Sequence, residues 1–202
     1  MALRLHLAPG SIGVAAQAAL AEARMAHDLV WLDFAAGAQR SAAHLALNAK
    51  GRVPVLETPR GPLTETVAIL EWIAATHPAA ALMPADPWQA ARAREAMAFL
   101  ASTMHPNHAH KRRGHRWADD PAAHAAMAAK VPGNMAENAA WLEPRIGPWV
   151  AETFSVADLH LWAITSWLDG DGVPLADFPN LADHHARVSE RPAIAAMPAS
   201  PA

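Results

Sequence analysis

The chain has 202 residues, 52% of them hydrophobic and 17% charged, so it can bury one large core or two smaller ones. Its formal net charge of −3, with mixed signs, argues against nucleic acid or an anionic membrane surface as the main partner. The chain contains no cysteine and no tyrosine, which excludes disulfides, thiolate metal ligands, enzyme-bound mixed disulfides and a phenol that activates a thiol.

The apolar residues are spread along the chain rather than gathered into one run. No window of about 18 uninterrupted apolar residues occurs, so no membrane-spanning helix is expected. Residues 1–7 alternate like a strand and lack the charged-then-apolar order of a signal peptide, so we expect a cytoplasmic protein.

The chain opens with a strand–helix–strand pattern. Leu3, Leu5 and Leu7 share one face at period two, which predicts a strand. An alanine-rich run over 14–25 favours a helix, and the mainly apolar segment 29–34 suits a buried strand. This order predicts a βαβ unit with a parallel strand pair.

A hairpin and a helix are expected next. Residues 53–57 and 63–64 have strand composition and flank a proline- and glycine-rich turn at 59–62. An apolar stripe at helical spacing follows and stops before Pro78.

The second half of the chain has helical patterns throughout. The proline-rich segment 83–88 therefore indicates a linker between a domain over 1–82 and an all-helical domain over 89–202. The resulting fold class is α/β followed by all-α.

Several residues mark helix ends in this second domain. Asp120 is expected to cap a helix that begins at Pro121, and Pro132 is expected to kink or break it. Ser155 and Asp158 have the spacing of a capping box. A last helix is expected over 181–191.

The strongest indication of a ligand-binding site in the first domain comes from Val53-Pro54 and Glu65-Thr66, which are here called the cradle. Pro54 lacks an N–H and restricts the chain, so Val53 can offer its own N–H and C=O to an extended ligand as another strand would. Glu65 and Thr66 stand where a helix begins, where free N–H groups and the helix dipole can hold a carboxylate. The Glu65 carboxylate can hold an ammonium. The pattern favours a small zwitterionic peptide as ligand.

The order of these parts resembles the cytosolic glutathione transferases, which have a thioredoxin-like domain, a linker and a C-terminal helical bundle domain. The motifs that carry the resemblance are the segments 48–56, 63–70, 154–158 and 178–181, the last followed by Arg191-Pro192. The segment 102–106 resembles the bacterial, beta-like members, in which a histidine reaches the glutathione site; here this residue is His105.

The resemblance implies further properties of the cradle. It implies that Val53–Pro54 is a cis bond and that Val53 pairs with the cysteinyl part of glutathione. It implies that Glu65 and Thr66 hold the γ-glutamyl end, and that Arg52 reaches the glycyl carboxylate. Glutathione would be the co-substrate, and no metal is expected. Family members are usually homodimers, so a homodimer is expected here.

The group that activates the thiol is left open by the sequence. Ser11 lies in the expected turn, and its hydroxyl can donate to a thiolate, so it is the candidate catalytic residue. Ile12 stands where beta-like members carry cysteine, and Leu7 stands where they carry an upstream tyrosine. A serine in a Pro-Gly-Ser turn is also a common turn residue. The backbone N–H groups of 11–13 are the alternative donors.

Histidines and basic residues are concentrated between 105 and 116. Their spacing does not bring them to one helical face, and no carboxylate lies among them before Asp119, so no metal site is expected. The basic run 111–116 is interpreted either as a solvated face or as a surface that attracts anionic electrophiles.

The sequence thus predicts conjugation of glutathione to an electrophilic, hydrophobic small molecule. The electrophile is expected between the domains, against the side chains Ile12, Met104, His108 and Lys111. One alternative is a glutathione-dependent reductase of disulfides or peroxides, and another is a non-catalytic module that binds glutathione or a protein partner. A zeta-type isomerase is disfavoured because the first turn holds only one serine.

Overall fold

The computed structural model describes residues 2–201 and divides into two compact units. The first, here called the sheet unit, comprises residues 1–83 together with 190–202, and the second, the helical unit, comprises 84–189. The expected second domain extends to residue 202, whereas the structure groups the last residues with the sheet unit. Arg191 explains this difference, because its guanidinium donates to both carboxylate oxygens of Glu22 at 2.6 and 2.9 Å.

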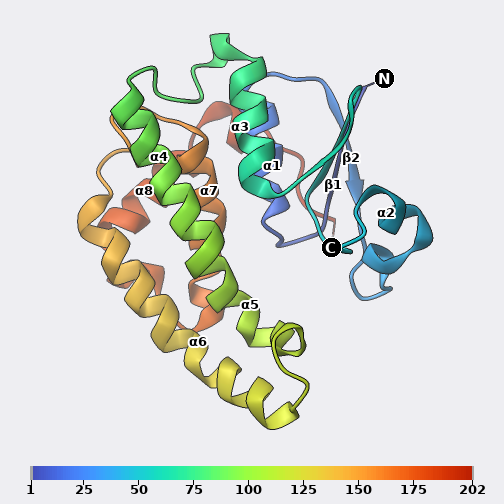
Figure 1. Cartoon of the computed structure of the whole chain (residues 1–202). Coiled ribbons are helices and arrows are strands. Elements are labelled where there is room, and N and C mark those ends of the chain that lie inside the picture. Colours follow the sequence, from blue (N-terminus) through green and yellow to red (C-terminus); the bar gives the residue numbers. More distant parts are fainter. Residues whose placement is uncertain (1, 202) are drawn as a thin grey trace. The chain divides into compact units, whose positions relative to one another are not determined.

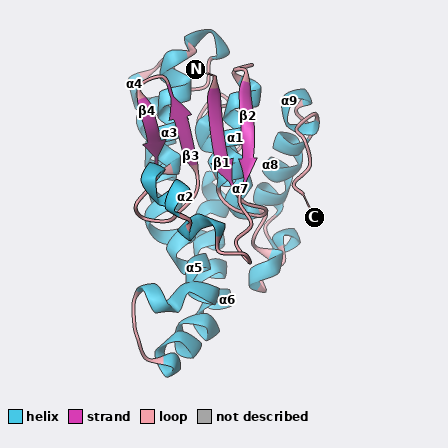
Figure 2. Cartoon of the chain, turned by 90° about the vertical axis from the view of Figure 1, so that its right-hand side faces the viewer, coloured by secondary structure: helices cyan, strands magenta, loops and turns pink. Residues whose placement is uncertain are grey.

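The sheet unit has a mixed four-stranded sheet with the order β2-β1-β3-β4 (Figure 2). The strands are β1 (Leu3–Leu7), β2 (His27–Trp31), β3 (Val55–Thr58) and β4 (Gly61–Thr64). As the βαβ pattern predicts, β1 and β2 are parallel; β3 pairs antiparallel with both β1 and β4. The thioredoxin-like sheet expected from the resemblance is confirmed.

Helices cover both faces of this sheet. The helices are α1 (Gly13–Glu22), α2 (Ala42–Leu47) and α3 (Thr66–Thr76), with the short α9 (Pro192–Ala195) beside α1. Figures 1 and 2 show α1 and α3 on one face and α2 on the other. Four alanines of α1 are fully buried, and their small side chains allow close packing against Leu5 and Leu7 of β1 and against α3.

Two expected strand boundaries are wrong by a few residues. The second strand covers His27–Trp31 rather than 29–34, because the chain turns at Asp33, whose carboxylate accepts the N–H groups of Ala35 and Ala36. The third strand begins at Val55 rather than Val53.

The helical unit consists of packed helices. These are α4 (Pro87–Phe99), α5 (His105–Arg113), α6 (Pro121–Leu142), α7 (Val156–Thr165) and α8 (Pro179–Ser189). Longer connections over 143–155 and 166–178 lie on either side of α7. A π-helical turn over Leu100–Met104 joins α4 to α5, and α5 packs along α6 (Figure 1). No helix among residues 2–201 is long and apolar enough to cross a membrane.

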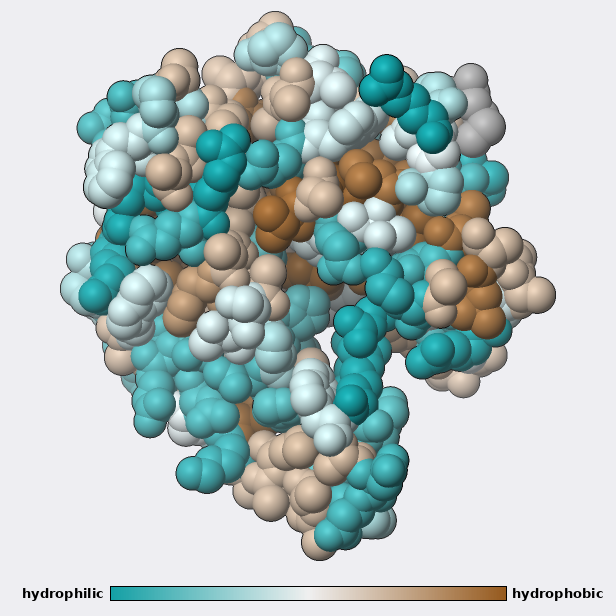
Figure 3. All heavy atoms as spheres, viewed as in Figure 1, coloured by the Kyte–Doolittle hydropathy of each residue, from teal (hydrophilic) through white to brown (hydrophobic). Residues whose placement is uncertain are grey.

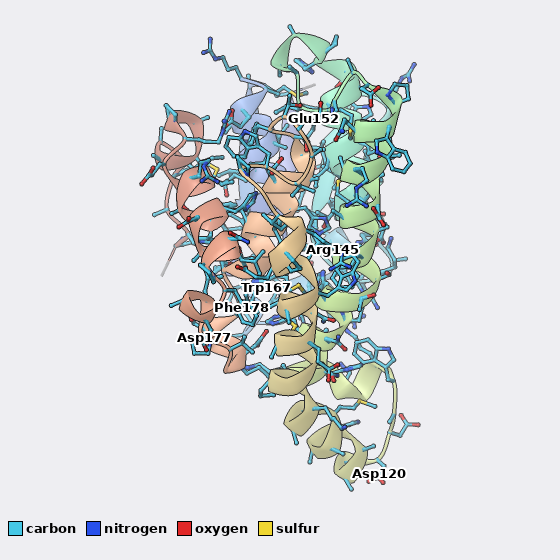
Figure 4. The ribbon with its side chains drawn as sticks, turned by 90° about the vertical axis from the view of Figure 1, so that its left-hand side faces the viewer. Asp120, Arg145, Glu152, Trp167, Asp177 and Phe178 are labelled. Carbon is cyan, nitrogen blue, oxygen red and sulfur yellow. The ribbon has the colours of Figure 1, made fainter. Side chains whose placement is uncertain are left out.

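The expected caps are present. Asp120, labelled at the tip of α6 in Figure 4, accepts the Ala122 N–H at 2.8 Å. Ser155 and Asp158 form the predicted capping box, and both residues are fully buried. Of the kink or break expected at Pro132, the break is wrong, because α6 continues through this residue. Pro132 is exposed and its neighbour Val131 is buried, so the helix keeps the packing of its inner face through the proline.

Candidate active site

Three segments of the sheet unit meet at one end of the sheet. The register pairs His6 with Val55, so the turn that follows β1 and the segment that precedes β3 lie at the same end of the sheet. The pairing of Val55 with Thr64 brings Glu65 to the same end. The turn after β1, the approach to β3 and the start of α3 therefore form one locus.

The chain at Val53 has the geometry that the resemblance implies. The Val53–Pro54 bond is cis, which confirms that expectation, and Pro54 is buried. Val53 is partly exposed and lies outside the strand pairing, and no backbone hydrogen bond engages it among residues 2–201. Its N–H and C=O are therefore available to an extended ligand.

The segment before Val53 is held by two side chains that the sequence did not identify. The Arg52 carbonyl accepts the Nε2–H of His44 at 3.0 Å and the Nδ2–H of Asn48 at 2.9 Å. His44 lies in α2 and Asn48 is its C-cap, and both are buried. Their i, i+4 spacing on a short helix was the available signal. The Arg52 side chain itself is exposed.

The start of α3 offers charge and open donors. Glu65 is the N-cap with φ 71° and ψ 121°, a conformation that is costly for a residue with a Cβ and that often occurs at functional sites. No backbone hydrogen bond engages the N–H groups of Thr66 and Val67 among the described residues, as is usual for a first helical turn. An anion at this point would meet free N–H donors.

The Glu65 carboxylate is already paired. It accepts the Lys50 ammonium at 2.5 Å, and the same ammonium donates to the Thr64 hydroxyl at 2.9 Å. The Glu65 side chain is 66% exposed, so this pair is weak and open to exchange. Lys50 is a third residue, after His44 and Asn48, that the sequence did not identify, although it lies in one of the family motifs.

The Ser11 hydroxyl is engaged in its own turn. It donates to the Ala8 carbonyl at 2.7 Å and accepts the N–H groups of Ala8 and Gly13 at 3.2 and 3.3 Å. To donate to a thiolate, this hydroxyl has to leave Ala8. The N–H of Ile12 precedes the first residue of α1, and no backbone partner for it is found within residues 2–201.

Of the remaining predicted residues, Ile12 belongs to the turn after β1, and the other four lie in the helical unit. The side chains of Ile12 and Met104 are buried. The other three belong to α5 and contact residues that follow α7. His105 meets the edge of Trp167 at 5.1 Å, and His108 stacks on the same indole at 4.1 Å. Lys111 contacts Asp171 and donates to the Gly170 carbonyl.

Two basic residues, at the end of α5 and in the turn after it, are exposed, whereas a histidine of α7 is buried. Arg112 and His115 are exposed, and Figure 3 shows hydrophilic residues beside a weakly hydrophobic area at the α5–α6 end of the helical unit. His160 in α7 is completely buried, and neither ring nitrogen has a hydrogen-bond partner. Burial, followed by repulsion from His105, lowers the pKa of His160 to about 3.

Residues 2–201 contain no group of three or more His, Asp or Glu side chains arranged to hold a metal ion.

Comparisons with known proteins agree with this geometry. Residues 1–75 match the family described as glutathione S-transferase, N-terminal domain, and residues 118–200 match glutathione S-transferase, C-terminal domain. A glutathione transferase homolog from Sulfitobacter, solved with bound glutathione, is 44% identical; the alignment covers 96% of both chains with a TM-score of 0.94. The chain belongs to the glutathione S-transferase family. The predicted resemblance and the predicted fold class are therefore confirmed.

Two further relatives are similar to this chain, one over nearly its whole length and the other over a shorter segment. A beta class glutathione S-transferase from Sphingomonas chungbukensis is 29% identical over 96% of both chains, with a TM-score of 0.81. A maleylacetoacetate isomerase from Pseudomonas aeruginosa is 40% identical over 73 residues. That match covers 36% of this chain and 34% of the relative, so the chain spans about a third of the length of this curated relative.

Proposed function

We propose that the protein is an enzyme that conjugates the thiol of glutathione to electrophilic, hydrophobic small molecules. The observation that carries the proposal is the open backbone of Val53 beside cis-Pro54, at the same end of the sheet as the start of α3. The glutathione-bound Sulfitobacter relative supports glutathione as the ligand.

In this proposal each end of glutathione meets a distinct group. Val53 pairs with the cysteinyl backbone, and Glu65 and Thr66 hold the γ-glutamyl end. Arg52 holds the glycyl carboxylate, and His105 contributes a further contact. The ligand ammonium has to share or displace Lys50 at the Glu65 carboxylate, because that carboxylate is already paired.

Activation of the thiol is proposed to come from the turn after β1. The Ser11 hydroxyl and the Ile12 N–H are the two candidate donors of a hydrogen bond to the glutathione thiolate. Stabilisation of an anion by a hydrogen-bond donor that is already in place is usually the largest single contribution to such catalysis. The Ile12 N–H needs no rearrangement, whereas the Ser11 hydroxyl has to give up the Ala8 carbonyl. The geometry therefore favours the Ile12 N–H, and Ser11 supports the turn.

The electrophile is proposed to lie against Ile12, Met104, His108 and Lys111. We further propose that the protein is a cytoplasmic homodimer, as its family leads us to expect. Reduction of disulfides or peroxides and non-catalytic binding have no specific observation in their favour. The similarity to a maleylacetoacetate isomerase covers too little of the chain to carry that substrate here.

The test of this function is turnover of glutathione with an activated aryl halide, measured alongside glutathione binding. We expect saturable binding of glutathione, and conjugation of glutathione to the aryl halide above the uncatalysed rate. Binding without turnover on any electrophile would favour the non-catalytic alternative. Turnover of glutathione with disulfides or peroxides alone would favour the reductase.

A further inference from the structure

A lysine of the sheet unit lies where the ammonium of the ligand is proposed to bind. The Nζ of Lys50 donates to the Thr64 hydroxyl at 2.9 Å and to the Oε1 of Glu65 at 2.5 Å. Within residues 2–201, Lys50 is the one cation that the Glu65 carboxylate meets. A lysine ammonium and the α-ammonium of a peptide carry the same charge and the same N–H donors, so the two compete for these acceptors.

The turn that carries Lys50 is held in place by other groups. The Asn48 side chain accepts the Lys50 backbone N–H at 3.2 Å. The same side chain donates to the Arg52 carbonyl at 2.9 Å, and His44 donates to that carbonyl as well. The backbone on both sides of Lys50 is thus fixed without the lysine side chain. The pair with Glu65 is not needed to hold the turn, so its effect falls on the carboxylate.

The pair can open at little cost. The side chain of Lys50 is 44% exposed and that of Glu65 is 66% exposed. An exposed ion pair of this kind changes an equilibrium by about two- to fivefold. A ligand ammonium can therefore displace Lys50 from the carboxylate. Because the lysine is tethered to the fixed turn, it returns to Glu65 whenever no ligand ammonium is present.

We propose that Lys50 is a specificity-determining residue that replaces the ligand ammonium at Glu65, so that the site also binds thiol peptides that lack this ammonium. The ligand class is glutathione without its amino group, which is glutaryl-cysteinylglycine. This inference rests on the proposed function and adds a ligand class to it. When glutathione binds, its ammonium takes the Glu65 carboxylate and Lys50 turns to solvent. When the amino group is missing, Lys50 stays, and the carboxylate keeps a partner.

Removal of the lysine should separate the two ligands. In Lys50→Met, glutathione no longer has to displace a cation, so it should bind at least as tightly as it binds to the wild type. The glutaryl peptide brings its own carboxylate to the start of α3, close to the Glu65 carboxylate. Without Lys50 no cation lies between these two like charges, so the glutaryl peptide should bind more weakly to the variant.

The experiment is calorimetry with glutathione and with glutaryl-cysteinylglycine on the wild type and on Lys50→Met. The dissociation constant of the glutaryl peptide divided by that of glutathione should rise about two- to fivefold in the variant, the contribution of one exposed ion pair. The neutral variant Lys50→Gln should give the same rise. Lys50→Arg keeps a cation and should keep the ratio of the wild type.

A matched control separates the contact from net charge. Arg60 is exposed in the turn between β3 and β4, at the other end of this hairpin from Thr64. Arg60→Met removes one positive charge far from Glu65 along the hairpin, so it should leave the ratio unchanged.

Three results would overturn the role of Lys50. The first is an equal ratio in the wild type and Lys50→Met, and the second is an equal rise in Arg60→Met. The third is weaker binding of glutathione itself to Lys50→Met, which would mean that the lysine binds glutathione directly. Absence of glutathione binding by the wild type would instead overturn the proposed function, on which this role depends.

Discussion

The buried histidine of α7 makes the stability of the protein depend on pH. His160 is fully buried, both its nitrogens lack partners, and its pKa is lowered from 6.5 to about 3, first by burial and then by His105. The folded protein therefore keeps this ring neutral, while the unfolded chain protonates it as the pH falls below 6.5. Between these two values the unfolded chain binds the extra proton, so stability is lost as the pH falls.

The magnitude follows from the difference between the two pKa values. One pH unit corresponds to about 1.4 kcal/mol, so at a pH of about 5 this single site should lower the free energy of unfolding by about 2 kcal/mol relative to neutral pH. The loss should continue down to about pH 3 and be absent above 6.5. His160→Phe removes the titrating group while keeping a ring of similar size.

The assay is denaturant unfolding of the wild type and His160→Phe at about pH 7.5 and pH 5. The loss of stability on acidification should be about 2 kcal/mol smaller in the variant, because contributions from all other groups cancel in the difference. His185→Phe should change the loss in the same direction, because burial also lowers the pKa of His185. Identical losses for the wild type and His160→Phe would show that the ring is protonated or solvated in the folded state.

Three further outcomes follow from the site and the assembly. Ser11→Ala should lower aryl-halide turnover by less than about threefold, because the Ile12 N–H that holds the thiolate is kept. A loss of turnover of about ten- to thousand-fold, with a raised pKa of the bound glutathione thiol, would show that the Ser11 hydroxyl holds the thiolate instead. Asn48→Ala should weaken glutathione binding several-fold by releasing the Arg52 carbonyl, and His44→Gln, which keeps a donor, should weaken it less; calorimetry on both variants checks this. Light scattering should report a dimer at micromolar concentration, and a monomer would contradict the proposed assembly.

The local parts of the site were predictable because they depend on neighbouring residues. Proline at position 54 and the strand pattern around it indicate an edge with free backbone groups at Val53. The capping signals at Asp120 and Ser155 depend on bonds within one helical turn, and both were confirmed. The β1–β2 pair followed from the preference of βαβ units for a parallel crossover.

The parts that were missed depend on contacts between distant residues or on the orientation of one bond. The hydrogen bond between His108 and Asp171 joins positions 63 apart, which no local pattern brings together. The direction of the Ser11 hydroxyl depends on where the Ala8 carbonyl points. The continuation of α6 through Pro132 depends on which face of that helix is buried, and this depends in turn on the packing of α5.

Calorimetry with glutathione, on the wild type and on Glu65→Ala, tests the central claim most directly. We expect saturable binding of glutathione to the wild type, with a dissociation constant in the micromolar to low-millimolar range. Affinity should fall about tenfold or more in the variant, because a charge-assisted hydrogen bond to the ligand ammonium is removed. Lys50→Met serves as the control, since it removes the competing ammonium and should not weaken binding in the same way. Absence of binding by the wild type, or equal affinity in Glu65→Ala, would contradict a glutathione site at the start of α3.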